Sequence, residues 1–318
     1  MSISVNEIYP EEYSQRILST SRSLPLWLSP KFIECYKDKL ILMATSGGAM
    51  KGFWVVPLTT QDNVKIAKRQ YRFLPYSSPL ILEEDNLKRR EIMFQLFRSL
   101  TKICDSIYLP MDPNFKDLPA IQSWGALVEW RHTHLLTRSL EFDKIDGRLR
   151  NHIKYAQNNV EIITNINPVD FRFDIAIKGS GDEKNQRQQL ALNLLANGQA
   201  IIITAKNKNR ICAGIFLAFD HQTAYMMHSW QLEDTPRGTI SKLIFEAVRW
   251  TFDVKKLKVF DFEGSVINNI DYFFCGFNAN ITPYGFIHWS NTKGSLNKLI
   301  DRSLDVDGRL NPEYINKN

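Results

Sequence analysis

The 318-residue sequence predicts an α+β fold of two tandem domains, each a mixed, mostly antiparallel sheet flanked by helices. Pairs of apolar runs joined by polar turns are typical of β-hairpins, and amphipathic segments that lead into apolar runs are typical of helices feeding a strand. Both patterns occur twice in the same order, at an offset of roughly 150–160 residues, which is about one domain length. We therefore expect an internal duplication.

The hairpins come first in each half. LILMATS is followed by a polar turn and KGFWVVPL, and AIIITAK is followed by NKNR and ICAGIFLAF. β-branched and aromatic residues favour strands, so each pair predicts two antiparallel strands. The predicted strand pairs are residues 40–46 with 51–58, and residues 200–206 with 211–219.

An amphipathic helix follows each hairpin. Apolar residues recur at helical spacing in both segments, and the apolar runs SIYLPM and KVFDF come next. A short helical segment and a further strand then close each half. The predicted helices are 87–103 and 239–253, and the closing turns and strands are 123–136 and 276–289.

These repeats predict an N-terminal domain over residues 1–140 and a C-terminal domain over residues 141–318. The second domain opens with a helix at 144–157. A second helix at 186–197 ends at Gly198, a residue typical of helix C-termini. The polar segment 178–189 indicates a mobile loop or the frayed start of that helix.

The net charge of +6 suits phosphate-bearing ligands but does not by itself indicate nucleic acid, and an ordinary solvated surface explains it equally well. The N-terminus does not resemble a signal peptide, and the apolar runs are too short to cross a bilayer. The cysteines form no CxxC pattern, which favours reduced thiols in a cytoplasmic protein. They are Cys35, Cys104, Cys212 and Cys275.

His132 and His134 alternate along a predicted strand and share a face. No carboxylate or cysteine stands near them in the sequence. We therefore expect no metal site there.

Two acids mark the end of the predicted strand KVFDF. Asp261 and Glu263 would share the strand face opposite Phe260 and Phe262. Buried carboxylates are costly unless they are paired or take part in chemistry. The pair is therefore either a catalytic base or a hydrogen-bonded structural feature, and the sequence leaves both open.

In their order and spacing these motifs resemble the GNAT acyltransferase superfamily, and the tandem arrangement resembles its FemAB-like N-acyltransferase branch. The resemblance covers nearly the whole chain, with 1–24 and 292–318 as loose ends. The motifs that carry it are RLRNHIKYA at 148–156, FDFEGS at 260–265, FFCGFNA at 273–279 and FLPYSSPLIL at 73–82.

The sequence departs from that branch in three places. Phe274 stands where peptidoglycan-bridge enzymes usually carry a lysine, and Asn278 replaces a closing glycine. The phosphate loop TPRGTISK at 235–242 contains one glycine only. These departures favour acyl-CoA over aminoacyl-tRNA as the donor.

The resemblance implies roles for individual residues. Asp261 or Glu263 would accept a proton from the attacking amine, and Tyr272 would protonate the leaving thiolate. A helix N-terminus binds phosphate well, so the start of the helix at 239 would hold the CoA pyrophosphate, while a splayed strand at 225–231 would receive the pantetheine arm. The expected cofactor-binding residues are Ser229, Trp230, Arg237, Gly238, Thr239 and Ile240, and the expected substrate-binding residues are Tyr76, Ser77, Arg150 and Tyr284.

Structural explanations stand beside each role. Pro236, Gly238 and Thr239 also fit a plain turn and helix cap, and Tyr272 also fits a helix-packing aromatic. Tyr76 and Ser77 also fit a surface turn, and the basic helix that carries Arg150 also fits a solvated face.

The expected function is N-acyl transfer from acetyl-CoA or another acyl-CoA to a primary amine, by direct attack. The acceptor would be an amino sugar, an amino acid or a peptide-like cell-wall or polysaccharide precursor. The first domain would have lost CoA binding and would form the acceptor side, and a monomer would suffice. One alternative is an aminoacyl-tRNA-dependent ligase of the peptidoglycan-bridge type. Another is a non-catalytic binding protein on the same scaffold.

Overall fold

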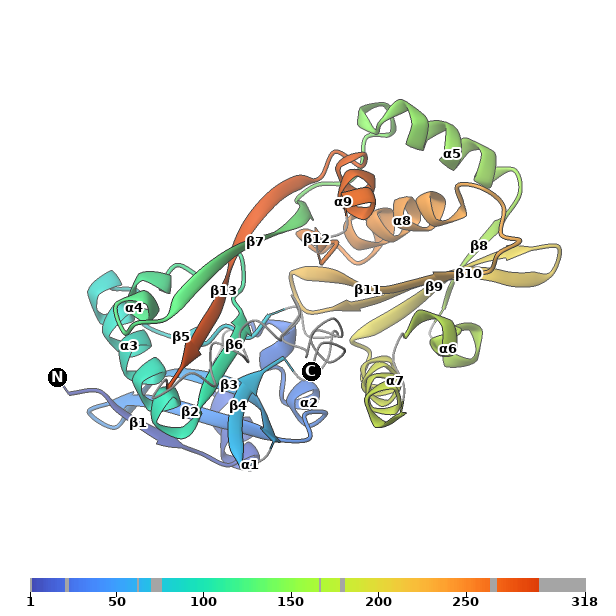
Figure 1. Cartoon of the computed structure of the whole chain (residues 1–318). Helices are drawn as coiled ribbons and strands as arrows, with labels where there is room; N and C mark the ends of the chain where they lie inside the picture. The colour runs from blue at the N-terminus through green and yellow to red at the C-terminus, as the bar shows by residue number, and fades with distance from the viewer. Residues whose placement is uncertain are drawn as a thin grey trace, which may run out of the picture. The chain divides into compact units, whose positions relative to one another are not determined.

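The computed structural model describes residues 2–20, 23–61, 63–69, 76–165, 167–177, 181–263 and 268–291. The chain divides into two compact units (Figure 1). Unit 1 is formed by the described residues within 1–22, 36–131 and 284–318, and unit 2 by those within 23–35 and 132–283.

These units do not follow the predicted domain ranges. An early segment, Ser23–Cys35, packs with the second half, and the chain passes between the units inside two strands, near residues 131 and 284. The backbone N–H of Leu26 donates to Asp220, and Trp27 meets Tyr225 edge to face. The predicted boundary near residue 140 marks where the sequence repeat begins, and it stays a prediction. The compact units are divided at other positions.

Unit 1 is a sheet with helices packed on it. Its strand order is β1-β2-β3-β4-β6-β13, and β5 pairs with β3. The elements are β1 (Ser4–Glu7), α1 (Pro10–Leu18), β2 (Lys39–Ser46), β3 (Ala49–Gln61), β4 (Val64–Lys68), β5 (Leu80–Ile81), α3 (Asn86–Ile103), β6 (Ser106–Pro110), α4 (Leu118–Gln122) and the outer parts of β7 (Leu127–Leu136) and β13 (Asn280–Ser290).

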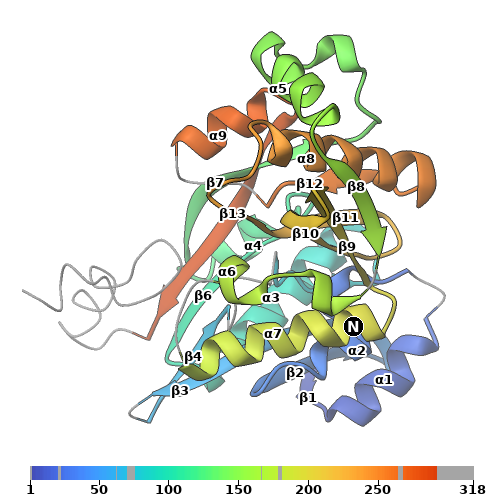
Figure 2. The ribbon, with the colours of Figure 1, turned by 90° about the vertical axis from the view of Figure 1, so that its right-hand side faces the viewer.

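Unit 2 repeats this plan. Its strand order is β7-β12-β11-β10-β9-β8, with α5, α8 and α9 on one face and α6 and α7 on the other (Figures 1 and 2). The elements are η1 (Leu26–Leu28), α2 (Pro30–Ile33), η2 (Phe142–Lys144), α5 (Gly147–Gln157), β8 (Glu161–Asn165), η3 (Pro168–Asp170), α6 (Phe173–Ala176), α7 (Gly181–Ala196), β9 (Ala200–Asn207), β10 (Arg210–Phe219), β11 (Thr223–Gln231), α8 (Thr239–Arg249), the π-helix η4 (Trp250–Val254), β12 (Val259–Asp261) and α9 (Asn268–Cys275).

The two predicted hairpins form as expected. In β2–β3 the turn residues Gly47 and Gly48 have φ of +57° and +78°, and in β9–β10 Lys208 and Asn209 have φ of +46° and +66°. Positive φ at both central residues is the mark of a tight two-residue turn whose twist matches that of paired strands. The turn residues and the β-branched residues of the adjoining strands therefore specify both hairpins without contacts from distant parts of the chain.

The internal duplication also appears in the strand pairing. Each half has a parallel pair, β4–β6 and β11–β12, joined through a long helix, α3 or α8. The closing strands are exchanged: β7 pairs antiparallel with β12, and β13 pairs antiparallel with β6. The fold is thus α+β with two mixed, mostly antiparallel halves, as predicted.

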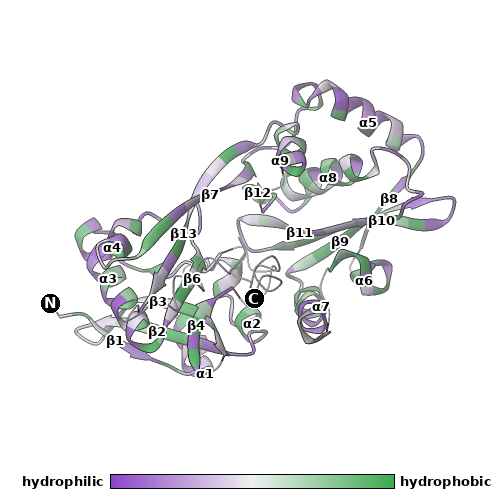
Figure 3. Ribbon diagram, viewed as in Figure 1, coloured by the Kyte–Doolittle hydropathy of each residue, from purple (hydrophilic) through white to green (hydrophobic). Residues whose placement is uncertain are grey.

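Each unit has its own hydrophobic core. In unit 1 the apolar face of α3 packs with β2 and β3, through residues such as Leu96, Phe97 and Trp54. In unit 2 Leu243, Ile244 and Phe260 lie in a core between α8 and the sheet. Figure 3 shows hydrophobic residues along β9 and β10 and a largely hydrophilic α5.

Candidate active site

The parallel pair β11–β12 separates soon after it starts. Register pairs join Thr223–Tyr225 to Val259–Asp261, while β11 continues to Gln231 beside β10. The β10 partners jump from Met226 to His228, so Met227 is the extra residue of a β-bulge. Beyond Tyr225 the described residues form no further register pair between β11 and β12, and the use of this edge by a ligand stays a prediction.

Asp261 ends β12 and is 1% exposed. Its Oδ1 accepts a hydrogen bond from the Thr133 hydroxyl at 2.5 Å and one from the backbone N–H of Glu263 at 2.7 Å. A carboxylate bonded to the N–H two residues ahead forms an Asx turn, which redirects the chain. These hydrogen bonds account for the burial of Asp261, and its catalytic role stays a prediction.

Glu263 follows with φ of +61°, a left-handed conformation that is uncommon outside glycine, asparagine and aspartate. Phe260 and Phe262 enter the core of unit 2, as the strand alternation predicts. The alternation stops before the second acid, because β12 ends at Asp261. Glu263 is half-buried just beyond the point where β11 and β12 separate, so of the two acids it is the more accessible.

The N-terminus of α8 meets helix α5. Gly238 has φ of +80°, and a Cβ at this position would lie 2.3 Å from the backbone oxygen of His152. Thr239 is buried, and its N–H and hydroxyl both bond to Pro236. The predicted turn is therefore present, and the glycine is required by the close approach of α5.

Positive groups gather at this end of α8. Arg237 is exposed, and no side chain of the described residues caps the helix. The corresponding helix of unit 1, α3, is capped instead by Asp85, whose carboxylate accepts from the Lys88 N–H. An anion would be favoured at the free end of α8 and repelled by the acid on α3.

His152 lies within this positive group. Burial lowers the pKa of its imidazole, and the guanidiniums of Arg237 and Arg148 lower it further. Its Nε2 is buried and has no hydrogen-bond partner among the residues that the structure describes. Both effects favour the neutral form of the imidazole in the folded protein.

We expect acid to destabilise the protein partly through His152. The unfolded chain protonates this imidazole at its ordinary pKa of about 6.5, above its folded pKa, so the free energy of unfolding falls as pH drops below that value. Urea unfolding at about pH 7.5 and about pH 5.5 measures the effect. The His152→Gln variant should lose less stability than the wild type over this interval. Equal losses in both proteins would contradict the assignment.

The other predicted cofactor residues differ in exposure. Ser229 is exposed and Ile240 is half-buried. Trp230 is buried and packs edge to face on Phe171, with ring centroids 6.2 Å apart. A Cβ on Gly214 would lie 2.6 Å from its Nε1, so only glycine fits beside the indole. Its side chain thus belongs to an aromatic cluster, which leaves only its backbone for ligand contact.

Tyr272 on α9 is 76% exposed, so it is not a packing residue of the core. Gly276, after α9, has another reason to be glycine: a Cβ there would lie 2.5 Å from Leu149 of α5. Asn278, where the family has a glycine, takes φ of +59°. Asparagine tolerates this conformation, so the departure from the family pattern preserves the backbone turn.

The predicted substrate residues of unit 1 are partly brought together. Tyr76 and Tyr284 meet edge to face at 5.6 Å. Ser77 is buried, its hydroxyl donates to Val55 O, and its carbonyl accepts from Trp54. Residues 76–79 are buried rather than a surface turn, and residues 73–75 of the same motif lie outside the described part.

Arg150, the remaining predicted substrate residue, lies on α5 in unit 2. Its guanidinium stands 3.6 Å from the exposed carboxylate of Asp143, a weak solvated ion pair. It remains free to move toward a ligand.

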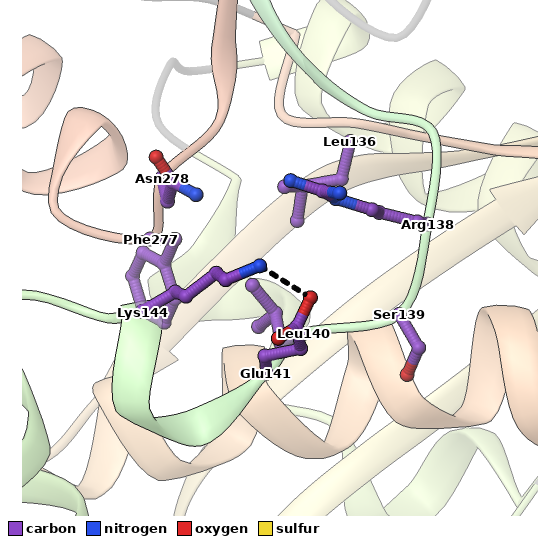
Figure 4. A pocket seen from close by; sticks show the side chains of 8 residues that line it. All are labelled: Leu136, Arg138, Ser139, Leu140, Glu141, Lys144, Phe277 and Asn278. Carbon is purple, nitrogen blue, oxygen red and sulfur yellow. Dashed lines mark hydrogen bonds and ion pairs between the residues drawn. The ribbon is translucent and has the colours of Figure 1, made fainter.

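A hollow adjoins the end of β7 and the segment after α9 (Figure 4). Lys144 donates to Glu141 at 2.8 Å across one side of it. No predicted site residue lines this hollow, which is bounded by Leu136, Arg138, Ser139, Leu140, Glu141, Lys144, Phe277 and Asn278.

The sequence analysis missed one cluster. His132 and His134 were judged to have no carboxylate or cysteine nearby, and this is wrong: α9 places Asp271 and Cys275 against them. Asp271 lies 139 positions after His132 and Cys275 lies 141 positions after His134, so no local pattern could join the two pairs. Burial and then Asp271 raise the pKa of the Cys275 thiol, and burial lowers the pKa of His134.

Comparison with solved structures decides the fold. FemX is similar over 94% of this chain and 100% of its own, with a TM-score of 0.63 and 11% identity. The chain has a FemAB-like tandem GNAT fold. A tandem GNAT protein from the clavulanic acid biosynthesis pathway, solved without acetyl-CoA, is similar over 92% of this chain and 100% of its own, with a TM-score of 0.54 and 9% identity.

A third similar structure is L-PGS from Bacillus licheniformis, with a TM-score of 0.54 and 11% identity over 92% of this chain and 96% of its own. No protein-family model and no curated protein sequence matches the chain. At these identities the likeness to FemAB-like and other GNAT proteins concerns the fold. None of the helices in the described residues is long and apolar enough to cross a membrane.

Proposed function

We propose that this GNAT-fold protein is an N-acyltransferase that moves an acyl group from acyl-CoA to a primary amine. The observation that carries the proposal is the separation of β11 from β12 directly before Glu263. It brings together the β12-facing edge of β11 beyond the last register pair, a β-bulge and a carboxylate. A thioester arm can bond to such an edge, and backbone N–H groups at a bulge suit a developing oxyanion.

In this proposal Glu263 is the base. An amine must be neutral to attack the thioester carbonyl, and a carboxylate beside it can accept its proton. Asp261 is a positioning residue, because its Asx turn fixes the backbone of Glu263. As the tetrahedral intermediate collapses, the C–S bond breaks and the exposed phenol of Tyr272 donates its proton to the leaving thiolate.

The α8 N-terminus is the proposed pyrophosphate site, with Arg237 beside a first turn that no described side chain caps. The acid that caps α3 supports the proposal that unit 1 no longer binds CoA. Tyr76 and Tyr284 of unit 1 are the proposed acceptor-side residues. An amino sugar, an amino acid or a peptide-like precursor is the proposed acceptor class.

Calorimetric titration with acetyl-CoA and with free CoA tests the donor. We expect Arg237→Glu to weaken binding of both by about 10–100-fold, the loss of one charge-assisted phosphate contact. Arg249→Glu, the same charge reversal at the other end of α8, is the matched control and should bind as the wild type does. Equal binding by both variants would place the pyrophosphate elsewhere.

The resemblance to peptidoglycan-bridge enzymes keeps one alternative, an aminoacyl-tRNA donor. Contacts to tRNA phosphates release counterions, so binding would fall steeply with salt. Salt-dependent tRNA binding without CoA binding would favour this alternative over acyl-CoA.

A further inference from the structure

Four potential metal ligands converge between β7 and α9 in unit 2. The Nε2 atoms of His132 and His134 lie 2.8 Å and 3.3 Å from Asp271 Oδ1. The Sγ of Cys275 lies 3.4 Å from His134 Nε2. One ligand atom each of the two histidines and the aspartate lies within 4.8 Å of the others.

Secondary structure explains how each element presents two ligands, and tertiary packing brings the two pairs together. Residues two apart on a strand point to the same side, which aligns the two imidazoles of β7. Residues four apart on a helix share a face, which aligns Asp271 with Cys275 on α9. Two rigid elements thus each present a pair of ligands toward one point.

The same residue types could form a Cys-His-Asp relay, but the geometry differs. In such a relay the nucleophile and the acid contact opposite nitrogens of the imidazole. Here Cys275 and Asp271 both approach Nε2 of His134. Its Nδ1 is buried and has no hydrogen-bond partner in the described part of the chain. Convergence on one nitrogen is the arrangement of ligands around a common centre.

We propose that His132, His134, Asp271 and Cys275 form a tetrahedral site for Zn²⁺. Two imidazoles, a carboxylate and a thiolate are a ligand set suited to this ion, and four protein ligands leave no open position, which is the pattern of a structural site. Both histidines bind through Nε2 and keep their protons on Nδ1. The thiol releases its proton to solvent on binding.

The contacts of the two histidines fit this assignment with a small adjustment. The Cys275 thiol lies outside the group of three whose ligand atoms are all within 4.8 Å of one another, so it must turn toward the common centre. Metal–ligand bonds of about 2.0–2.3 Å place neighbouring tetrahedral ligands roughly 3.3–3.8 Å apart. The two contacts of His134 Nε2 already lie at 3.3 Å and 3.4 Å. The 2.8 Å contact of His132 must lengthen by about 0.5 Å to reach that range. The His132 side chain is 40% exposed, so its ring can turn, and this side offers the ion an entry path.

The site would fasten α9 to β7. Thr133, between the two histidines, points to the other side of the strand and bonds to Asp261, so the ion lies behind the proposed transfer site rather than in it. The proposal is independent of the proposed function. Because Nδ1 of His134 lacks a supporting acceptor, we expect affinity roughly 10–100-fold below that of a fully supported site.

Cobalt substitution tests the site. The full-length protein is freed of metal with a chelator and titrated with CoCl₂. We expect one Co²⁺ per chain, the intense visible bands of a tetrahedral complex, and a near-ultraviolet charge-transfer band from the thiolate. ZnCl₂ should displace the colour and raise the Tm of the metal-free protein.

Variants locate the ligands. Cys275→Ser should lose the charge-transfer band, and His132→Gln should weaken Co²⁺ binding by at least roughly tenfold. Cys35→Ser and His221→Gln, a comparably half-buried cysteine and an exposed histidine elsewhere in unit 2, should behave as the wild type does. Circular dichroism of each metal-free variant confirms folding. Absence of a tetrahedral spectrum, or binding unchanged in both ligand variants, would overturn the proposal.

Discussion

Replacing Glu263 with Gln will lower kcat/KM for acyl transfer by about 10²- to 10⁴-fold, the usual contribution of a general base. The amide has nearly the shape of the carboxylate but cannot accept the proton of the attacking amine. The variant should fold as the wild type does, because the bond to Asp261 uses the backbone N–H of residue 263 and not its side chain.

The measurement is the initial rate of CoA thiol release from acetyl-CoA across a panel of amine acceptors. Glu233→Gln, an exposed acid just after β11, is the matched control and should keep full activity. Asp261→Asn keeps an acceptor oxygen for Thr133 and residue 263, so it should lose less activity than Asp261→Ala. A Glu263→Gln enzyme with wild-type turnover would remove the base assignment.

Gly238→Ala will reduce the free energy of unfolding by about 2–5 kcal/mol. A left-handed alanine costs about 1–2 kcal/mol, and overpacking adds about 1–3 kcal/mol. The overpacking arises because the new Cβ would lie 2.3 Å from His152 O, a backbone atom that cannot move without shifting α5. The same shift would disturb the proposed pyrophosphate site.

Gly198→Ala separates the two contributions. Gly198 follows α7 with φ of +68°, and a Cβ there meets no atom within 4 Å. Its substitution should therefore show the conformational cost alone. Urea unfolding of both variants gives the difference. Equal losses of stability would mean that α5 does not press on the start of α8.

The fold was largely predictable, because its signals are local. Turn residues with positive φ, β-branched flanks and helical periodicity specified β2–β3, β9–β10, α3 and α8 without distant partners. The repeat order then predicted the tandem arrangement. The sequence did not reveal that β7, from the first half, pairs with β12 and that β13, from the second half, pairs with β6. This exchange depends on which of two similar sheets each closing strand joins.

The candidate site was predictable only as a set of residue types. Asp261 and Glu263 stood out because acids at the end of a buried strand are costly. Their division into a buried turn-former and an accessible acid needed Thr133, which is 128 positions away in sequence from Asp261. The premise that no carboxylate or cysteine lies near His132 and His134 failed for the same reason, since Asp271 and Cys275 come from α9.

The sequence by itself determined the element order and the duplicated α+β architecture. It also singled out Gly238, Asp261 and Glu263 as unusual residues at the ends of helices and strands. Only the tertiary structure decided why those residues are there. Gly238 and Gly276 make room for α5, Asp261 holds the turn to Glu263, and α9 brings Asp271 and Cys275 to the two histidines of β7. Periodicity and turn propensity act between neighbours in the chain, whereas close approach and ligand convergence are properties of packed elements.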